Sequence, residues 1–556
     1  MTVRPGWITT VLVAGALGVG SLGWSSAAAA QPPKVVSVQL LNVSDWHGQI
    51  DPLNNVGGAA VLSSYFKAER AVNPNTITFT AGDAFGATPP LASFFDEEPA
   101  VRTMRLMGFD LDGLGNHNWD KGNAHLQRMI DIARAETGEP GTPFRYLSAN
   151  LTNLRRNLKH VAPYRIFERG DVKIGFVSVT NPEAPGLVFP GNFGTIAITD
   201  PVLAANNARA ELNRRGVRTN VLIGHMGVTG FDPQGNPVGP LIDLAKGVTG
   251  FDVVAGDHTD VQYSGVIDGK LVYENRSKAL TYAKVNLNVD KRSGRTLDTS
   301  LSFVTPATVG VLPDQAIVDY LAPLRAELAT ALDGKIGVAT DLFPRGGVPS
   351  AERSGESALG NLTADSMRSA YGTQLALTNG GGLRASLPSS YVPAAAGLDR
   401  TAPAPYDLVI GDVFTVLPFG NQVVTRTVTG TQLWAALENG VSRLALPPAA
   451  PADGCTGADG RFPQVSGFRF TLSCGAPAGS RIRSVTLNDG TPIPNDPATS
   501  YSFATNDFVN TGGDEYSMFR DGQGVSRDLM ASVLQRYIQG LGTITPLIEG
   551  RIIKLA

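Results

Sequence analysis

The sequence predicts an α/β (α+β) protein in which a helix joins two domains. At 556 residues the chain is too long for one ordinary hydrophobic core. From residue 35 to about residue 305, β-branched and apolar runs alternate with segments of helical periodicity, which is typical of an α/β domain. None of the six histidines follows residue 258. The second half therefore differs in composition, and we expect it to be a separate domain.

The first domain is expected to alternate strands and helices in the order that builds a layered sheet. Apolar or β-branched runs predict the strands, which we expect at residues 35–43, 76–81, 109–114, 172–179, 221–223 and 251–256. Apolar residues at helical spacing predict the helices, which we expect at residues 97–107, 123–136 and 201–215.

One long helix is expected between the two halves. Pro313 stands at its start, five apolar residues follow at helical spacing as far as Leu332, and Gly334 stands past its end. We divide the chain into a first domain at 31–312, a connector at 313–334 and a second domain at 335–556. An ordinary packed helix of either domain remains an alternative interpretation.

Two Pro/Ala/Gly-rich stretches in the second half, 388–405 and 446–463, are predicted to be surface loops. Cys455 and Cys474 are the only cysteines. In an exported protein they favour a disulfide, which would close a loop of about 20 residues and stabilise by roughly 3 kcal/mol. Two free thiols are the alternative.

The N-terminus has the features of an export signal. Arg4 precedes a mostly apolar stretch at 7–24, and four alanines end at Ala30. We expect a signal peptide at 1–30 and a secreted or cell-envelope location, with an uncleaved membrane anchor as the alternative. No other segment approaches the roughly 20 apolar residues that span a bilayer, so we expect no stable membrane insertion after signal cleavage.

Composition excludes one broad class of function. The chain is 42% hydrophobic and 17% charged, with a formal net charge of −3. No strongly basic field exists to hold a phosphodiester backbone, so a binder of polymeric nucleic acid is not expected. Nothing in the sequence specifies an oligomeric state.

Polar side chains follow five of the predicted strands, at the point where each strand ends. Ligands of open α/β sheets bind beyond the carboxyl ends of the strands, so these side chains can meet at one site. The side chains in question are Asp45, His47, Asp83, Asn116, His117, Asp120, His225, His258 and Asp260. Carboxylate, amide and imidazole groups in such numbers suit metal binding and proton transfer.

In order and spacing these motifs resemble the five blocks of calcineurin-like metallophosphoesterases. The motifs are Asp45-Trp46-His47, Gly82-Asp83, Gly115-Asn116-His117, Gly224-His225 and Gly256-Asp257-His258-Thr259-Asp260. The resemblance implies two packed sheets flanked by helices, and a site that holds two divalent metal ions.

The resemblance also implies which residue serves which ion. Asp83 would bridge both ions; Asp45, His47 and Asp260 would complete the first, and Asn116, His225 and His258 the second. Mixed N/O ligation suits Zn, Mn, Co, Fe or Mg, and the sequence does not choose among them. Asp260 departs from the family, which commonly has His or Gln there, and its ligand role is in doubt. Asn118 also departs from the family, which often has an acidic residue at this position.

By the same resemblance, His117 and Asp120 are the catalytic pair. His117 would stabilise the transition state or protonate the leaving group, and Asp120 would fix its tautomer. Asp120 as a helix cap is the alternative, and the two roles are compatible. His125 and His160 lie outside the motifs and are expected at the surface.

Motifs of the second half resemble the C-terminal domain of secreted bacterial 5'-nucleotidases. The blocks are Asn379-Gly380-Gly381-Gly382-Leu383-Arg384, Leu417-Pro418-Phe419-Gly420-Asn421, Thr505-Asn506-Asp507-Phe508 and Gly512-Gly513-Asp514. Phe419 and Phe508 would stack on a base, or are core aromatics. The remaining candidates for substrate binding are Arg353 and Arg384 for phosphate, and Asn379, Asn421 and Asp514 for base or sugar.

The resemblance therefore implies an exported dimetal phosphohydrolase that cleaves the 5'-phosphate of nucleotides. Three related activities remain open: 2',3'-cyclic nucleotide phosphodiesterase, UDP-sugar hydrolase and dinucleotide pyrophosphatase. A non-catalytic exported binding protein of the same fold is the alternative from another class.

Overall fold

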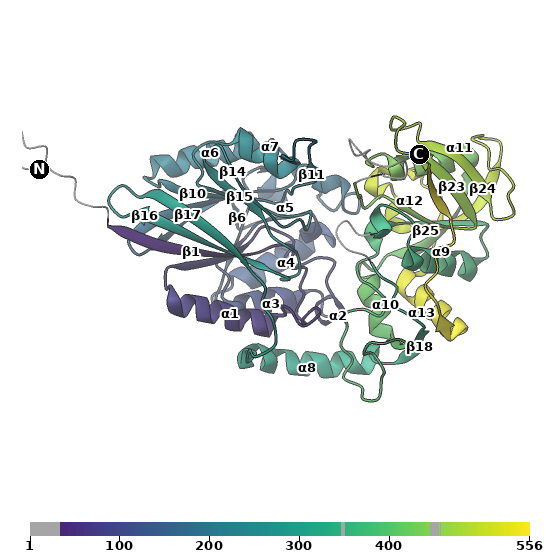
Figure 1. The fold of residues 1–556 in the computed structure, drawn as a ribbon, viewed down its shortest axis with the longest axis horizontal. Coiled ribbons are helices and arrows are strands. Elements are labelled where there is room, and N and C mark those ends of the chain that lie inside the picture. The colour runs from purple at the N-terminus through teal and green to yellow at the C-terminus, as the bar shows by residue number, and fades with distance from the viewer. Residues whose placement is uncertain (1–33, 346–350, 445–454, 456, 556) are drawn as a thin grey trace, which may run out of the picture.

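The computed structural model describes residues 34–345, 351–444, 455 and 457–555. Two bodies lie side by side, the first built by the N-terminal half and the second by the C-terminal half, and helix α8 lies below the first body and leads to the second (Figure 1). The mixed α/β class is confirmed. The expected signal segment lies outside the described residues.

Two sheets face each other in the first body. The seven-stranded sheet has the order β17-β16-β1-β2-β3-β4-β6, and the six-stranded sheet has the order β14-β15-β13-β10-β8-β7. The strands of the first sheet are β1 (Val35–Val43), β2 (Thr76–Thr80), β3 (Leu111–Asp112), β4 (Arg145–Leu147), β6 (Val161–Ala162), β16 (Tyr282–Asp290) and β17 (Arg295–Val304). Those of the second are β7 (Tyr164–Arg169), β8 (Val172–Val179), β10 (Thr219–Gly224), β13 (Val253–Gly256), β14 (Tyr263–Ile267) and β15 (Lys270–Glu274).

Apolar side chains fill the space between the sheets and under the helices. Phe79 and Phe176 meet edge to face across the sheet interface, with ring centroids 5.4 Å apart. The helices of the first body are α1 (Ala59–Val72), α2 (Pro90–Ser93), α3 (Glu98–Met107), α4 (Gly122–Arg134), α5 (Leu154–Asn157), α6 (Pro201–Arg214) and α7 (Pro240–Gly247). Buried residues of α1, α3 and α4 share one apolar cluster, and those of α6 and α7 share another.

Parallel pairing brings together the carboxyl ends of the strands that precede the predicted metal ligands. β1 pairs in parallel with β2, and β2 with β3. β10 pairs in parallel with both β8 and β13. The loops that leave β1, β2 and β3 therefore emerge together, as do the loops that leave β10 and β13.

The helix expected between the halves is α8 (Gln315–Leu332), which begins after Asp314 rather than at Pro313. Asp314 caps it by accepting a hydrogen bond from the Ala316 N–H. Its buried leucines pack in the same cluster as Tyr391 and Val409 of the second half. The helix thus contacts both halves of the chain.

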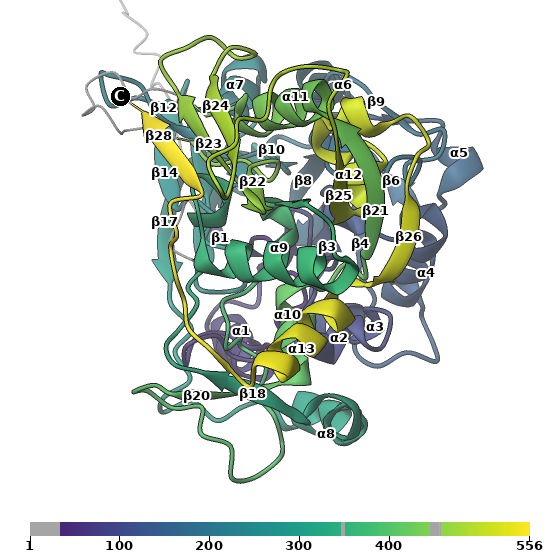
Figure 2. The ribbon, with the colours of Figure 1, turned by 90° about the vertical axis from the view of Figure 1, so that its right-hand side faces the viewer.

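The second body contains a five-stranded sheet of order β22-β19-β25-β21-β26 and two three-stranded sheets, β20-β18-β27 and β24-β23-β28 (Figure 2). Its strands are β18 (Lys335–Ala339), β19 (Leu375–Asn379), β20 (Tyr406–Val409), β21 (Gln422–Thr429), β22 (Pro463–Ser466), β23 (Phe468–Ser473), β24 (Ile482–Leu487), β25 (Ser500–Asn506), β26 (Val525–Leu529), β27 (Thr543–Ile544) and β28 (Ile552–Leu555). Its helices are α9 (Ala358–Tyr371), α10 (Ile410–Val416), α11 (Gly430–Val441), α12 (Asp507–Asn510) and α13 (Met530–Leu541).

Each of the two stretches that were expected to be surface loops includes a buried residue. Tyr391, in the first stretch, is buried, and its hydroxyl donates to Asp333 at 2.6 Å. The second stretch was expected to extend to residue 463, but Pro463 begins the buried strand β22. Residues 446–454 and 456 of that stretch lie outside the described residues. Cys455 and Cys474 form the expected disulfide.

Among the described residues, every helix is too short or too polar to cross a membrane.

Candidate metal-dependent active site

Five of the seven predicted metal ligands have left-handed backbone conformations. Their φ angles are 36° at Asp45, 49° at His47, 49° at Asp83, 89° at His258 and 62° at Asp260. Such conformations cost about 1–3 kcal/mol each for residues other than glycine, and they cluster at functional sites. The turns that follow β1, β2 and β13 are therefore held in strained shapes that aim these side chains.

Four ligand atoms of the proposed second metal converge on one point. His225 Nε2 lies 3.0 Å from Asp83 Oδ2, 3.3 Å from Asn116 Oδ1 and 3.2 Å from His258 Nδ1. The other ring nitrogen of His225, Nδ1, donates to the Ala81 carbonyl at 3.2 Å, so Nε2 faces the three other ligands. Two imidazole nitrogens and two oxygens form a donor set typical of a divalent transition metal.

The proposed first metal site adjoins it. His47 Nδ1 donates to the Gly86 carbonyl at 2.8 Å, which leaves Nε2 3.8 Å from Asp45 Oδ1. The other carboxylate oxygen of Asp45 accepts the His258 N–H at 2.7 Å. This hydrogen bond thus connects Asp45 of the first proposed site to His258 of the second.

Asp83 has the features of a carboxylate that bridges two cations. Its side chain is 1% exposed, and neither oxygen accepts a hydrogen bond from the described residues. A buried carboxylate with empty acceptor positions is costly unless a cation compensates it. A Cβ atom at Gly115 would lie 2.3 Å from Asp83 Oδ1, so glycine is needed for the close approach of the two loops. The residues present fit two metal ions.

Asp260 differs from the other predicted ligands. Three groups of acidic and imidazole side chains have ligand atoms within 4.8 Å of one another: His47, Asp83 and His117; Asp83, His225 and His258; and Asp45, His225 and Asp257. Asp260 belongs to none of these groups in the described chain. Its charge nevertheless acts on Asp45, whose pKa burial raises to about 6, with Asp260 adding to the rise.

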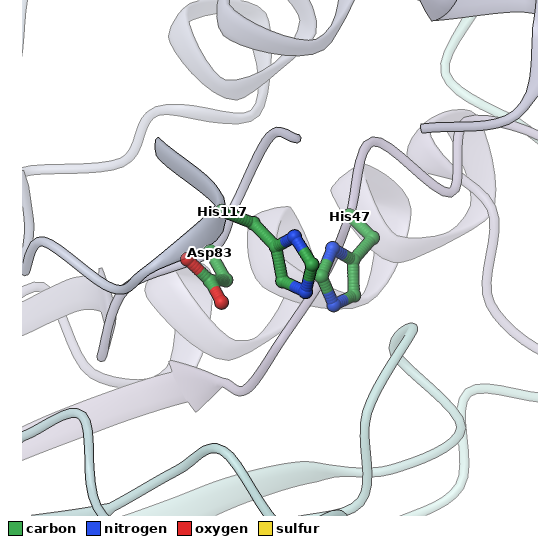
Figure 3. Close-up of side chains that lie close together, drawn as sticks. All are labelled: His47, Asp83 and His117. Atoms are coloured by element: carbon green, nitrogen blue, oxygen red, sulfur yellow. The ribbon is translucent and has the colours of Figure 1, made fainter. Parts of the chain in front are cut away.

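His117 and Asp120 are paired as expected. His117 Nδ1 lies 2.9 Å from Asp120 Oδ2 and 3.1 Å from Oδ1, so an N–H there donates to the carboxylate and Nε2 is left for other partners. Figure 3 shows His117 beside Asp83 and His47, and the ring centroids of the two histidines lie 5.1 Å apart. The catalytic candidate therefore borders the metal ligands directly.

Asn118 holds this loop in place although it is not a ligand. Its Oδ1 accepts the Gly115 N–H at 2.8 Å and the Asp83 N–H at 3.3 Å. An amide oxygen performs this task without adding negative charge, so the departure from an acidic residue is compatible with the site.

Burial lowers the pKa of His47 well below its ordinary value, and the charges of His117 and Arg384 add to this. The neutral imidazole is the form that binds metals. For His225, burial also acts to lower the pKa, but the negative charge of Asp83, whose Oδ2 lies 3.0 Å from Nε2, outweighs burial and raises the pKa to about 9. A cation bound there would compete with a proton.

Two of the three predicted sugar and base contacts of the second body, Asn379 and Asp514, lie in one hydrogen-bonded group. Asn379 Nδ2 donates to Asp514 Oδ2 at 2.8 Å, and Asn506 Nδ2 donates to Asn379 Oδ1 at 3.0 Å. Burial raises the pKa of Asp514 to about 6. Asn421 lies apart from this group, where its amide donates to Asp507 at 2.7 Å.

The two predicted stacking rings lie against the first body. Phe419 stacks on His117, with ring centroids 5.7 Å apart and an interplanar angle of 16°. Phe508 lies 6.4 Å from Phe189, a ring of the first body. Both rings are part-buried rather than enclosed in the core.

The two predicted phosphate-binding arginines keep unfilled donors. Nε of Arg353 is buried and has no hydrogen-bond acceptor in the part of the chain that the structure describes. Arg384 donates to the Gly381 carbonyl at 3.5 Å, and its guanidinium lies over the Phe419 ring at 5.6 Å. Burial lowers the pKa of Arg384 to about 9, with the charges of Arg353 and Arg345 adding to the shift.

Comparisons with known proteins agree with this arrangement. Residues 335–521 match the model of the 5'-nucleotidase C-terminal domain. A 5'-nucleotidase precursor from Thermus thermophilus superposes with a TM-score of 0.78 at 27% identity, over 94% of this chain and 99% of that one. The chain therefore resembles 5'-nucleotidases over nearly its whole length.

The relatives of this chain differ in length. Endonuclease YhcR of Bacillus subtilis is 27% identical over 86% of the chain, but the chain spans only 37% of YhcR. Protein UshA of Escherichia coli is 23% identical, over 93% of the chain and 94% of UshA.

Four residues at the candidate site were not singled out from the sequence. Asp257 accepts the Asp45 N–H at 3.1 Å and the His258 N–H at 3.0 Å, and so ties two ligand loops together. The others are Phe189, Lys278 and Arg345. Asp257 lies inside a recognised motif, whereas no local pattern marks the remaining three.

Proposed function

We propose that the protein is an exported phosphohydrolase that releases the 5'-phosphate of nucleotides. The first body would hold two divalent ions and cleave the ester. The second body would hold the base and sugar. Similarity to 5'-nucleotidases supports a nucleotide phosphohydrolase, and the 5'-monophosphate as substrate is the finer part of the proposal.

The contact between Phe419 and His117 carries this proposal. It brings a ring of the recognition domain against the catalytic candidate of the metal domain, at 5.7 Å between centroids. A base stacked near Phe419 would leave its 5'-phosphate within reach of the metal ligands, because ribose and phosphate extend the nucleotide by only a few bonds.

Each side chain has a defined role in this proposal. Asp83 would bridge the ions; Asp45 and His47 with Asp260 would hold one, and Asn116, His225 and His258 the other. When bound, two such ions would supply positive charge to the phosphate oxygens and lower the pKa of the attacking water.

His117 would act on the ester itself. Asp120 holds the Nδ1–H of His117 at 2.9 Å, so Nε2 is the nitrogen that would donate a proton to the leaving 5'-oxygen. Arg353 and Arg384 would bind the phosphate oxygens, because a guanidinium offers paired donors to an anion.

Hydrolysis of a panel of substrates, followed by analysis of the products, tests the proposal. AMP, UMP, UDP-glucose, 2',3'-cyclic AMP and p-nitrophenyl phosphate would each be tested with added Mn, Zn, Co or Mg. We expect the highest kcat/KM on the nucleoside 5'-monophosphates, and loss of activity after chelation that returns with metal.

Two outcomes would reject it. Hydrolysis of 2',3'-cyclic AMP to an adenosine monophosphate, or of UDP-glucose to UMP and glucose 1-phosphate, with no hydrolysis of AMP would identify another activity on this fold. Absence of hydrolysis of every substrate by protein that carries two metal ions would favour a binding protein.

A further inference from the structure

The loop after β15 presents a lysine that the proposed mechanism does not use. Asn275 fixes this loop: its amide donates to the Asn42 carbonyl at 3.1 Å and to the Thr281 carbonyl at 3.0 Å. Lys278 within the loop has a φ of 57°. This left-handed conformation is unfavourable for lysine, and such residues cluster where a side chain must be aimed.

The backbone and side chain of Lys278 contact opposite sides of the proposed site. Its N–H donates to the carbonyl of the proposed metal ligand Asp45 at 3.0 Å. Its Nζ donates to the Arg384 carbonyl at 3.4 Å, in the other body. The lysine side chain therefore extends from the metal ligands towards the proposed phosphate-binding arginines.

Positive charge is in excess around this ammonium group. Arg345, Arg353 and Arg384 all act on Lys278 as like charges, and Asp260 is the one anion among its strongest electrostatic neighbours. Glu352 pairs with Arg345, whose Nε donates to it at 2.8 Å. Asp459 and Asp120 also act on two of these arginines, so the positive groups are partly balanced, and an added anion would stabilise them further.

Hydrogen-bond donors are likewise in excess. An ammonium has three N–H donors, and in the described residues Lys278 Nζ makes one long hydrogen bond, to the Arg384 carbonyl. Nε of the neighbouring Arg353 is buried without an acceptor there. Unfilled donors that share one region indicate a ligand rich in oxygen acceptors.

We propose that Lys278 is a phosphate-binding residue supplied by the metal domain, whose ammonium contacts a non-bridging oxygen of the substrate phosphate. This inference rests on the proposed function. It adds a cation that is fixed to the metal ligands through Asp45, whereas Arg353 and Arg384 belong to the other domain.

Binding of inorganic phosphate to the metal-loaded protein tests the inference. We compare wild type with Lys278→Met, which removes the charge, and with Lys278→Gln, which keeps a donor for the Arg384 carbonyl. Both variants should weaken phosphate binding by about 10- to 100-fold, the range of one hydrogen bond to a charged group. Metal content should stay at the wild-type value.

Steady-state kinetics adds a second measurement. In both variants, kcat/KM should fall by a similar factor for AMP and for p-nitrophenyl phosphate, because the contact is with the phosphate. Inhibition by adenosine, which has no phosphate, should be unchanged. Lys159→Met, which removes the charge of an exposed lysine in the same domain, should match wild type throughout.

Two results would overturn the inference. Unchanged phosphate affinity in Lys278→Met would exclude the contact. Wild-type phosphate affinity in Lys278→Gln together with weak phosphate affinity in Lys278→Met would show that Lys278 only tethers Arg384. If the Met variant does not fold, the phosphate affinity of the Gln variant alone decides. Because phosphate binding needs no turnover, an inactive wild type would refute the proposed function without deciding this question.

Discussion

At the scale of single residues, Asp83 is expected to be the most sensitive ligand, because one side chain serves both proposed ions. Asp83→Asn should abolish hydrolysis and lower the metal content, measured by elemental analysis, more than any other single ligand change. Asp112→Asn is a matched control: Asp112 is also fully buried, but its carboxylate accepts the Gly82 N–H at 3.2 Å. Normal metal stoichiometry in Asp83→Asn would remove Asp83 as the bridge.

His117 should separate catalysis from metal binding. His117→Ala is expected to keep both metals and the fold while kcat falls by about 10² to 10⁴, the usual contribution of a general acid or base. His160→Ala changes an exposed histidine and should have no effect. Loss of a metal from the His117 variant would instead make this residue a ligand.

The two aromatic rings should distinguish nucleotides from a simple aryl phosphate. Phe419→Ala and Phe508→Ala are expected to raise KM for AMP by about 5- to 100-fold, since stacking contributes roughly 1–3 kcal/mol per base. KM for p-nitrophenyl phosphate should change little, because its small ring need not reach the recognition domain. Equal loss on both substrates would show that the rings are structural.

The sequence predicted those metal ligands whose placement follows from the order of the strands. Asp83 and Asn116 follow neighbouring parallel strands of one sheet, and His225 follows a parallel strand of the other sheet, so the rule that ligands bind beyond the carboxyl ends of strands led to all three. Lys278 and Arg345 sit in loops of different bodies, and their proximity depends on how the bodies dock. No periodicity along the chain encodes that docking.

His125 was expected at the surface, and this was wrong. Helix α4 turns this side chain towards α3, where it is 9% exposed and its Nε2 lies 2.9 Å from the Asp96 carbonyl. A lone histidine at the margin of an apolar helix face gives little sign of which side it faces. His160, expected at the surface as well, is exposed.

At the scale of elements, the bounds of the long periodic segments were predicted to within two or three residues. One error comes from assigning a proline to a loop. Residue 463 was placed in a loop because proline cannot donate a ladder hydrogen bond. Pro463 is the first residue of β22, on the edge of its sheet, where a missing donor is tolerated.

Helix α3 begins beside a buried acid that should make stability depend on pH. Burial raises the pKa of Glu97 from 4.5 to about 7, and Asp120 and Asp96 add to the rise while Lys121 opposes it. The folded state therefore binds this proton more tightly than the unfolded state, so stability should fall as pH rises from about 4.5 to 7 and then level off. The full effect is about 3 kcal/mol.

Chemical denaturation across this pH range checks the effect. Glu97→Gln removes the titrating group and should lose that part of the pH dependence, so the variant gains stability relative to wild type as pH rises towards 7. Glu211→Gln, at an exposed site on α6, is the control. Parallel pH profiles for wild type and Glu97→Gln would show that Glu97 ionises normally.

At the scale of the whole molecule, function depends on two bodies meeting over one substrate. The contacts between them include a stacked pair at Phe419, an aromatic contact at Phe189, an ion pair at Glu183 and the hydrogen bond from Lys278 to the Arg384 carbonyl. Domains of one chain are expected to move relative to one another unless their interface is large and hydrophobic. We infer that the closed arrangement is one member of an equilibrium that substrate would shift.

The ion pair offers a way to change that equilibrium without touching the site. Arg443 donates to Glu183 at 2.9 Å across the bodies, and both side chains are well exposed. Glu183→Gln removes the attraction, and Glu183→Arg makes the contact repulsive. An exposed pair is worth at most about 1 kcal/mol, so global stability should not change measurably. KM for AMP should rise in the order wild type, Gln, Arg, with up to about a fivefold step for the removed pair.

Salt should abolish this difference, because ions screen exposed charges beyond about 10 Å at 0.1 M and more strongly at higher concentration. The three proteins should therefore converge in KM as the salt concentration rises towards about 1 M, while Glu211→Gln matches wild type at every concentration. Arg443 also lies 3.8 Å from Asp459 and 3.7 Å from Glu515, within its own body, so the changes are made at Glu183 and leave those contacts intact. If Glu183→Arg has the wild-type KM at low salt, this pair does not contribute to closure, and the aromatic contacts hold the two bodies together.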